Sequence, residues 1–430
     1  MILNEELLAI HRGEQGEGMM KILNTLIMYG EAFDASEMVK ITGSMGHAVI
    51  GGAPVTWAPL VELFEEWVEE GLKSKVPLTT DPRPRDRHIR LSFTKNLMYA
   101  YLYSRQKRLE KALRALGVED MDNFTCTPYL EQIGNIPQKG DILSWAESSA
   151  VVYVNSVLGA RCNRNSGVIE LMGNILGYVP KFGLLTDEGR KAGWIIDVRC
   201  ESRPDPQILG STIGMKVIDE VPFIKGLDQW IGTELNCDSI SFLKDMGAAA
   251  ASNGSVGLYH VAEMTPEAKE QGESIIRDGA PIYVIDDAEL KRVKDSYPCM
   301  WDDPEASPEI CFIGCPHLSA EQILDWADRI DSSLRKNGLT SVNVYTIFLS
   351  SPKVIDAVEK VYPDYIKKLD RMGILLTSIC PLSFSSNPMC KNMNMITCSN
   401  KFRYYSHARF FSEAELVEEI TKEVGNDKEL

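Results

Sequence analysis

The sequence predicts an α/β protein of more than one domain, with parallel strands in open sheets. Its 430 residues exceed what one hydrophobic core usually serves, so two or three domains are expected. Hydrophobic residues make up 44% of the chain, which is enough for a substantial interior. From Glu309 to Cys380, apolar strand patterns alternate with amphipathic helix patterns. We expect a helical region over residues 1–120, an α/β core over 121–285 and an α/β domain over 286–430.

The N-terminal region shows mainly helical patterns. Apolar residues recur at helical spacing over Glu17–Tyr29 and over Leu60–Leu72. A glycine-rich loop between these helices holds His47, and a lone histidine among small residues suits structural packing as well as function. The segment DPRPRDRHIR (81–90) is a charged loop, which suits a solvated turn or an edge that a partner contacts.

A second informative stretch runs from Asn123 to Gly167. Cys126 lies between two threonines just before Pro128, so we place it in an irregular loop. The helical pattern from Trp145 to Leu158 is unusually polar. Its polar residues are Glu147, Ser148, Ser149, Asn155 and Ser156. Such residues are typical of a helix that is buried against a polar ligand or cavity. The alternative interpretation is a tight crossing of two helices, which needs small side chains.

A glycine-bounded loop follows, with Arg161, Asn163 and Arg164. This combination is typical of a site that binds carboxylate or phosphate, and surface arginines are the alternative. Farther along, Asn236–Ser252 is an alanine-rich helix whose small side chains indicate close packing. His260 lies at a strand end, where a hydrogen-bonded core histidine is the preferred interpretation.

The segment 309–380 predicts strand, helix, strand, helix, strand. The strands are expected at Ile310–Ile313, Val342–Leu349 and Leu375–Ile379. The first strand should stop at Gly314, and a capping box from Ser319 to Gln322 should begin the first helix. Pro352 suits the first turn of the second helix.

Strands joined by helices of this length lie parallel, so their carboxyl ends share one edge of the sheet. Cys315, Ser350 and Cys380 follow the three strand ends and are expected on that rim. Ligands of open α/β sheets bind in the crevice outside it. Two cysteines more than sixty positions apart thus become neighbours, which is a first indication of a metal or redox site.

After Cys380 the chain is rich in short polar clusters. Ser399, Lys401 and Tyr405 fall in a loop and the start of a helix. The lysine suits contact with an anionic substrate group, and a solvated helix cap is the alternative. An acidic helix and a frayed tail should complete the chain.

Composition disfavours several classes of function. With 45 basic and 61 acidic residues the net charge is -16, which opposes binding to nucleic-acid phosphates or anionic membranes as the main activity. The chain has neither a run of about 18 apolar residues nor a signal-peptide pattern, so we expect a soluble, cytoplasmic protein. Its ten cysteines then suit core positions, metal ligands or catalytic thiols better than disulfides. No CxxC pair occurs, which excludes a zinc ribbon or ferredoxin-type run and leaves a site built from distant segments.

Five ordered motifs resemble the large, catalytic subunit of aconitase X. They are TCTPY (125–129), WAESSAVVYVNSVLGARCNR (145–164), GAAAASNGSVGLYHVAEMTPEA (247–268), GCPHLS (314–319) and TCSNKFRYY (397–405). The likeness runs from about Glu14 to Glu415. It implies an aconitase-like fold without the swivelling domain, since the chain ends soon after the catalytic part. A separate small subunit would supply that domain and, with it, the serine that acts as the base.

The resemblance also implies dehydration of a small hydroxy acid at an iron or iron-sulfur centre. The implied ligands are Cys126, Cys315 and Cys380. The cofactor would be a four-iron four-sulfur cluster, with a two-iron two-sulfur cluster or mononuclear iron as alternatives. Catalysis would involve Glu147, Ser148 and Ser149. Substrate binding would involve Asn155, Arg161, Asn163, Arg164, Ser399 and Lys401.

Two positions depart from the family pattern, and the function keeps alternatives. Cys162 stands where threonine is usual, and the loop around His47 matches only loosely. The family offers two substrates, phosphomevalonate and cis-3-hydroxy-L-proline, and the TCTPYL and ESSAV spellings favour the first. A non-enzymatic, iron-sensing binding protein is an alternative of another class, which the charge of -16 disfavours. Structural zinc is a third, disfavoured by the dispersed cysteines.

Overall fold

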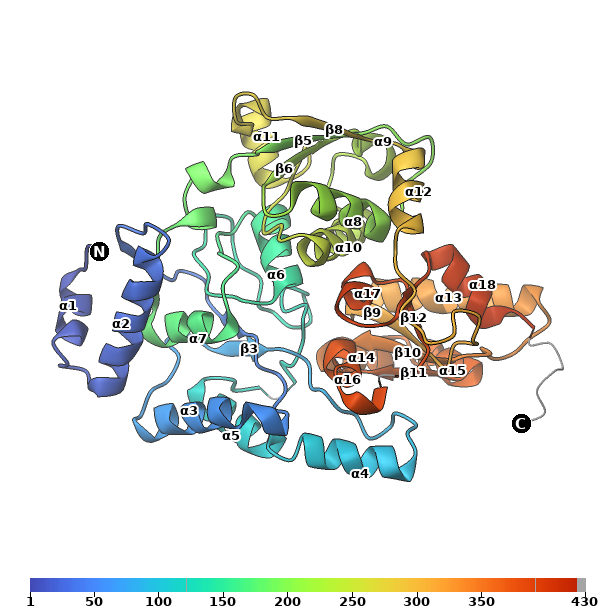
Figure 1. Cartoon of the computed structure of the whole chain (residues 1–430), viewed down its shortest axis with the longest axis horizontal. Helices are drawn as coiled ribbons and strands as arrows, with labels where there is room; N and C mark the ends of the chain where they lie inside the picture. The colour runs from blue at the N-terminus through green and yellow to red at the C-terminus, as the bar shows by residue number, and fades with distance from the viewer. Residues whose placement is uncertain (121, 391, 424–430) are drawn as a thin grey trace.

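The computed structural model describes residues 1–120, 122–390 and 392–423, and the tail expected at the end of the chain lies outside these ranges. The elements form three groups in Figure 1. The N-terminal helices, in blue, lie at the left and bottom, a sheet with its helices lies at the top, and a second sheet, in orange and red, lies at the right.

The N-terminal part is mainly helical, as its apolar periodicity predicts. Its helices are α1 (Glu5–His11), α2 (Glu17–Glu31), α3 (Ala58–Glu69), α4 (Phe93–Leu102), α5 (Gln106–Leu116) and α7 (Gly167–Leu176). Its strands are β1 (Met38–Lys40), β2 (Gly46–Ala48), β3 (Leu78–Thr80) and β4 (Tyr178–Pro180). β1 pairs antiparallel with β4, and β2 pairs parallel with β3. Leu23, Phe64 and Leu113 share one core with Leu171 of α7, so this core includes residues beyond 120. The predicted domain boundaries stay predictions.

The middle part is a parallel sheet in the order β7-β6-β5-β8. Its strands are β5 (Trp194–Val198), β6 (Pro222–Lys225), β7 (His260–Val261) and β8 (Ile282–Ile285). Its helices are α6 (Ser148–Tyr153), α8 (Pro206–Val217), α9 (Asp228–Ile231), α10 (Cys237–Asn253), α11 (Pro266–Gln271) and α12 (Asp287–Asp295). α6 continues as a π-helical turn over Val154–Leu158.

The alanine-rich helix α10 packs closely, as predicted. A Cβ added at Gly210 of α8 would lie 2.1 Å from the carbonyl oxygen of Met246. One added at Gly214 would lie 2.5 Å from that of Ala250. The small residues therefore let two helix backbones come into contact.

The C-terminal part is a parallel sheet in the order β11-β10-β9-β12-β13, which confirms the predicted strand, helix, strand pattern. Its strands are β9 (Ile310–Leu318), β10 (Tyr345–Ser350), β11 (Ile374–Thr377), β12 (Met395–Thr397) and β13 (Arg409–Phe410). Its helices are α13 (Ala320–Lys336), α14 (Pro352–Val361), α15 (Pro363–Met372), α16 (Pro381–Ser385), α17 (Asn400–Tyr405) and α18 (Glu413–Thr421). The predicted capping box at Ser319 and Gln322 begins α13.

Three expected strand boundaries are wrong. β10 begins at Tyr345 and not at Val342, β11 ends at Thr377 and not at Ile379, and the end of the first strand differs in a way that shapes the site. β9 does not stop at Gly314 but continues to Leu318, with a register shift against β10 after Phe348. Gly314 has a φ of 111°, and a Cβ there would lie 2.4 Å from the carbonyl oxygen of Leu349. Only glycine suits this backbone, which bulges out before pairing resumes at Ser350. Cys315 is carried on the bulge.

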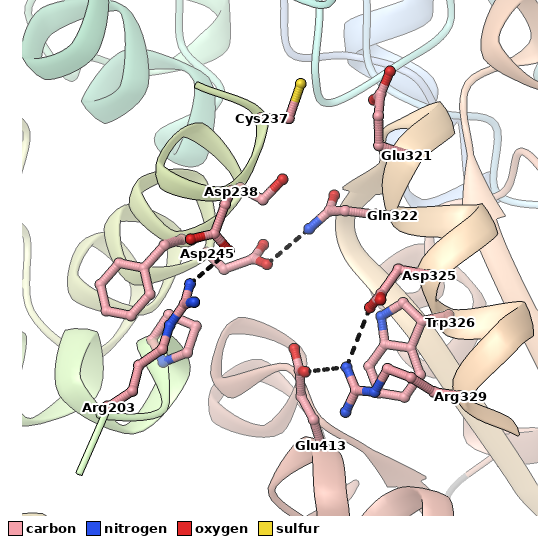
Figure 2. Close-up of a pocket in the computed structure, with 13 residues that line it drawn as sticks. Arg203, Cys237, Asp238, Asp245, Glu321, Gln322, Asp325, Trp326, Arg329 and Glu413 are labelled. Atoms are coloured by element: carbon pink, nitrogen blue, oxygen red, sulfur yellow. Dashed lines mark hydrogen bonds and ion pairs between the residues drawn. The ribbon is translucent and has the colours of Figure 1, made fainter. Parts of the chain in front are cut away.

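A groove of about 370 Å³ lies between the middle and C-terminal parts, lined by α10 and α13 (Figure 2). Its charged groups pair with one another. The pairs are Arg203 with Asp238 at 2.7 Å, Gln322 with Asp245 at 3.0 Å, and Arg329 with Asp325 at 3.5 Å. Of these three contacts, the one between Gln322 of α13 and Asp245 of α10 joins the two parts, whereas each of the other two lies within one part. In the described part of the chain, no helix is both long and apolar enough to span a membrane.

Candidate active site

Three cysteines from distant segments converge in the interior. Cys126 lies in the loop between α5 and α6, Cys315 lies on the bulge of β9, and Cys380 is the N-cap of α16. All ten cysteines of the chain fall within the described residues and are free thiols, as expected. Cys126 and Cys315 are buried, and Cys380 is partly buried. Cys315 and Cys380 lie close enough for Cys380 to affect the pKa of Cys315, although Cys315 lies within β9 and not after its end. The role of these cysteines as ligands stays a prediction.

His317 connects the three cysteine segments, and the sequence reasoning missed it. Its backbone N–H donates to Cys126 Sγ at 3.3 Å, and its Nε2 lies 3.2 Å from the carbonyl oxygen of Ile379, next to Cys380. That oxygen can only accept, so Nε2 carries the proton and Nδ1 accepts from Thr125 Oγ1 at 3.4 Å. Burial lowers the pKa of His317 to about 4, which keeps this neutral tautomer. Its place two residues after Cys315 was the available signal.

The surroundings of the thiols suit metal binding. Burial raises the pKa of all three thiols, that of Cys315 to about 12, while the positive charge of Lys401 opposes the rise. The sulfur of Cys380 accepts from the Ser383 N–H at 3.4 Å, a contact that favours thiolate. A single ion needs ligands that point at one spot, and among the described residues no group of three His, Cys, Asp or Glu side chains does so.

An ion pair between Glu147 and Lys401 lies next to the cysteines. Glu147 is the N-cap of α6 and accepts from Ser149 N at 3.1 Å and Ser149 Oγ at 2.9 Å. Lys401 of α17 donates to Glu147 and, at 3.3 Å, to Ser149 Oγ. Burial alone raises the pKa of Glu147, but Lys401 and Ser149 outweigh burial and hold it below the ordinary value. Burial lowers the pKa of Lys401, yet Glu147 and the nearby thiols raise it overall. The pair is therefore ionised.

Buried His47 and partly buried Asp81 lie next to this ion pair. His47 Nδ1 lies 2.8 Å from Thr79 Oγ1, while His47 Nε2 and Asp81 Oδ1 lie 3.9 Å apart. Neither of these two atoms has a hydrogen-bond partner among the described residues. Burial lowers the pKa of His47 to about 4, and burial together with the charge of Glu147 raises that of Asp81 well above its ordinary value. The sequence reasoning missed Asp81, because it begins a charged loop that resembles a surface turn.

A cavity of about 580 Å³ opens onto this polar cluster. It is lined by Val49, Ala146, Glu147, Ser148, Arg164, Asn165, Ser166, Ser255, Leu382, Lys401 and Tyr405. The cavity thus collects Glu147, Ser148, Arg164 and Lys401 from the predicted site residues. Arg164 Nη1 is buried and has no hydrogen-bond partner among the described residues. A free guanidinium beside an ammonium suits a substrate with an anionic group.

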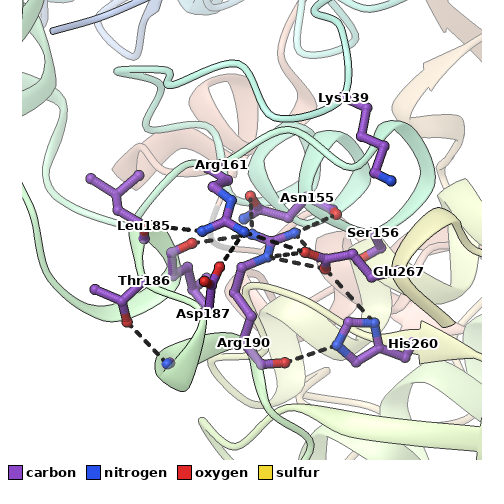
Figure 3. Close-up of polar contacts among 12 residues, drawn as sticks. Lys139, Asn155, Ser156, Arg161, Leu185, Thr186, Asp187, Arg190, His260 and Glu267 are labelled. Carbon is purple, nitrogen blue, oxygen red and sulfur yellow. Dashed lines mark hydrogen bonds and ion pairs between the residues drawn. The ribbon is translucent and has the colours of Figure 1, made fainter. Parts of the chain in front are cut away.

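The remaining predicted residues lie outside this cavity. Arg161 donates to Asp187 at 2.5 Å and to the carbonyl oxygen of Leu185 at 3.3 Å (Figure 3). Asn155 donates to the carbonyl oxygens of Cys162 and Gly257, both at 2.8 Å. The contacts of Asn155 hold the loop that carries Arg164, whereas Arg161 pairs with an exposed carboxylate.

Asn163, Ser399 and Cys162 are likewise occupied by backbone contacts. Asn163 donates to the carbonyl oxygen of Phe182 at 3.0 Å, and Ser399 donates to that of Cys315. The thiol of Cys162 is buried and donates to the carbonyl oxygen of Trp145 at 3.3 Å. These side chains position the neighbours of the cavity.

The interpretation of His260 as a core histidine is confirmed. His260 is buried, with Nε2 2.9 Å from the carbonyl oxygen of Arg190 (Figure 3). Arg190 in turn pairs with Glu267 at 2.7 Å in the protein interior. This network supports the middle part and lies away from the cysteines.

Comparison with known proteins assigns relatives to most of the chain. A model of the aconitase X first domain matches residues 1–188, and one of the second domain matches residues 192–295. The phosphomevalonate dehydratase large subunit of Thermococcus kodakarensis is 32% identical over 76% of this chain and 77% of that protein. The large subunit of the same name from Methanothermobacter thermautotrophicus is 35% identical over 76% of this chain and 75% of that protein.

More distant relatives and a solved structure agree. The cis-3-hydroxy-L-proline dehydratase of Pseudomonas aeruginosa is 27% identical over 74% of this chain and 52% of that protein. The crystal structure of aconitase X from Thermococcus kodakaraensis, in its holo form, superposes with a TM-score of 0.80 at 27% identity. It covers 98% of this chain and 100% of the other. The whole described architecture therefore has a counterpart of known structure.

Proposed function

The chain belongs to the aconitase X family, and from this premise we propose that it is the large subunit of a dehydratase acting on phosphomevalonate. The enzyme is a carbon–oxygen hydro-lyase, in agreement with relatives that are named dehydratases. Names that specify a large subunit support a small-subunit partner.

One observation carries this proposal most directly. The ionised pair of Glu147 and Lys401 and the unpaired guanidinium edge of Arg164 line one cavity, and the three thiols lie close enough to Lys401 for their charges to affect one another. The thiols supply soft ligands for iron, and the cations supply a place for an acidic substrate. A purely structural metal site would need neither the cavity nor the unpaired arginine.

Cys126, Cys315 and Cys380 would hold an iron-sulfur cluster, for which we favour four irons and four sulfides. With three protein thiolates the cluster keeps one iron open, and that iron would polarise the hydroxyl that the substrate loses. The fit depends on the arrangement of the thiols and on Lys401, whose charge opposes the effect of burial on the thiols.

The side chains of this chain bind and orient the substrate. Arg164 and Lys401 would hold its phosphate or carboxylate oxygens with charge-assisted hydrogen bonds. Glu147 lies on the cavity wall as a carboxylate that accepts from the Lys401 ammonium, so it can relay a proton from Lys401 to the substrate hydroxyl, which then leaves as water. Ser148 and Ser149 keep Glu147 in place. The base for the adjacent carbon would come from the small subunit.

The test is a joint measurement of metal and activity. The chain is produced with its candidate small subunit and purified without oxygen, and iron and acid-labile sulfide are measured per chain. Near-equal iron and sulfide, with loss of water from phosphomevalonate, would support the proposal. Iron without sulfide would contradict the cluster and indicate a mononuclear iron centre. Dehydration of cis-3-hydroxy-L-proline and not of phosphomevalonate would contradict the proposed substrate and identify cis-3-hydroxy-L-proline in its place.

A further inference from the structure

The helix α4 exposes an apolar face that no described part of the chain covers. Phe93, Leu97 and Tyr101 are 83%, 63% and 68% exposed, and Met98 is 53% exposed. Phe93, Leu97 and Tyr101 are four residues apart, so they form one stripe along the helix. α4 lies at the lower edge of the molecule beneath α16 (Figure 1). A stripe of large apolar side chains in contact with water indicates a binding surface.

Beside this stripe lies a basic groove of about 430 Å³. Its basic lining residues are Arg83, Arg85, Arg87 and Lys107. Ala100 and Ser104 also line it and follow Leu97 at helical spacing, so the groove borders the apolar stripe. Arg85, Arg87 and Lys107 have no carboxylate within 4.0 Å among the described residues, whereas Arg83 pairs with Glu110.

The charge of this region is opposite to that of the whole protein. Residues 82–114 contain ten Lys or Arg against two Asp or Glu, while the chain carries a net charge of -16. The surface therefore favours a partner with acidic side chains around an apolar patch. We name the stripe of Phe93, Leu97 and Tyr101, together with Arg85 and Arg87, the α4 surface.

The other side of α4 is attached to the segment that carries Cys380. Tyr99 OH donates to the carbonyl oxygen of Phe384, and Tyr103 OH donates to that of Ser383 at 2.7 Å. The charged loop is attached as well, since Cys380 N donates to the carbonyl oxygen of Arg83 at 2.9 Å. Leu382, in the same short segment, lines the cavity. One segment thus contacts α4 on one side and the cavity on the other.

We propose that the α4 surface is the docking site of the small subunit, which binds through acidic and apolar side chains and is thereby held beside the mouth of the cavity. The inference rests on the proposed function, because that function requires a second chain to bring a base to the substrate. The attachment of α4 to the Cys380 segment favours this occupant, because a chain docked on α4 lies next to the segment that lines the cavity.

The test compares the binding of separately purified subunits, without cluster or substrate, by interferometry. The small subunit comes from the same organism as the chain. Two variants alter the α4 surface: Phe93→Ser with Leu97→Ser and Tyr101→Ser, and Arg85→Glu with Arg87→Glu. The matched controls carry Ile282→Ser with Met300→Ser and Val361→Ser, which are 64%, 63% and 64% exposed, and Lys336→Glu with Lys360→Glu.

We expect the apolar variant to weaken binding by about 30-fold or more and the controls to change it less than about threefold. The charge variant should weaken binding more at low than at high salt. Unchanged affinity in both α4 variants, with melting temperatures like the wild type, would overturn the assignment, as would absence of binding by the wild type.

Other occupants give distinct results that would also overturn it. If a second copy of this chain occupies the α4 surface, the wild type sediments as a dimer and the triple variant as a monomer. If a membrane occupies it, the triple variant loses binding to vesicles of phosphatidylglycerol. In both cases the affinity for the small subunit stays unchanged. Failure of the proposed function looks different. In that case the subunits bind through the α4 surface, but the complex loaded with iron dehydrates neither substrate.

Discussion

Lys401 and Glu147 form a buried ion pair although they are 254 positions apart in the sequence. The contact joins the start of α17 in the C-terminal part to the start of α6 in the middle part. Because both ends are charged and shielded from water, each depends on the other.

Lys401→Met should leave the Glu147 carboxylate buried and unpaired. We expect it to lower the free energy of unfolding by about 3–5 kcal/mol, and to abolish dehydration. The double variant Lys401→Met with Glu147→Gln should be more stable than Lys401→Met alone, because it leaves no isolated charge in the interior. Urea unfolding of the two singles and the double measures this coupling. Additive effects would show that the two side chains do not interact.

Cys380→Ala should lose iron, sulfide and activity while the fold survives. The fold is expected to survive because the thiol, beyond the site, only accepts the Ser383 N–H. Metal analysis measures the loss of iron and sulfide, and circular dichroism of the same sample tests whether the fold survives. Cys299→Ala is the control, because Cys299 is exposed and outside the cavity. Full iron content in Cys380→Ala would contradict the ligand assignment.

His317→Phe should reduce iron loading although His317 is not one of the assigned ligands. The phenyl ring leaves the carbonyl oxygen of Ile379 without its donor, at a cost of about 1–3 kcal/mol, and loosens the segment before Cys380. His317→Gln keeps a donor near the position of Nε2 and should recover part of both losses. Iron per chain and melting temperature of the two variants are compared with the wild type. Equal loading in both would exclude this positioning role.

Arg164→Ala should raise KM for the acidic substrate by about tenfold or more, because an unpaired guanidinium on the cavity wall is removed. Arg161→Ala is the matched change in the same loop. Arg161 pairs with Asp187, which is 90% exposed, so its loss should cost little and leave KM nearly unchanged. Steady-state kinetics of both variants decide between the two arginines. A larger effect at Arg161 would place the anion elsewhere.

Glu170 should make stability fall as pH rises. Burial raises the pKa of its carboxyl to about 8, although Ser144 and Asn165 hydrogen-bond to it. A folded-state pKa above that of the unfolded chain means that this stabilisation is complete below about pH 4.5 and is lost as pH rises through about 8. Glu170→Gln should therefore match the wild type at pH 5 and exceed it at pH 8.5. Melting temperatures across this range test the difference, and parallel curves would contradict the shift.

The local patterns of the sequence were sufficient for most elements. The capping box at Ser319, the proline of the first turn at Pro352 and the alanines of α10 each specify their own element, and the structure agrees. Parallel pairing of β9, β10 and β11 followed from the helices between them. The bulge at Gly314 could not be predicted, because it depends on how closely the backbone of β10 approaches.

The site was predictable only where residues carried their own chemical signal. Cys315 and Cys380 were placed by topology, and Cys126 by resemblance. Asp81 and His317 act through contacts with segments far away in the sequence. Nothing local distinguishes Asp81 from a loop residue, and the only local signal of His317 is its place two residues after Cys315. The sequence does not distinguish Arg161 from Arg164. Only the tertiary structure shows that Arg161 forms an ion pair with Asp187.

The separation of the three cysteines along the chain bears on how the protein matures in the cell. A ribosome makes Cys126 long before Cys380, and β9 gains its neighbour β12 only after residue 397. Iron delivery during synthesis would therefore find an incomplete set of thiols in a protein that has not yet closed around them. On the proposed ligand set, loading of the centre would therefore need the chain beyond Cys380, and a shortened product that ends before Cys380 would lack one of the three thiols.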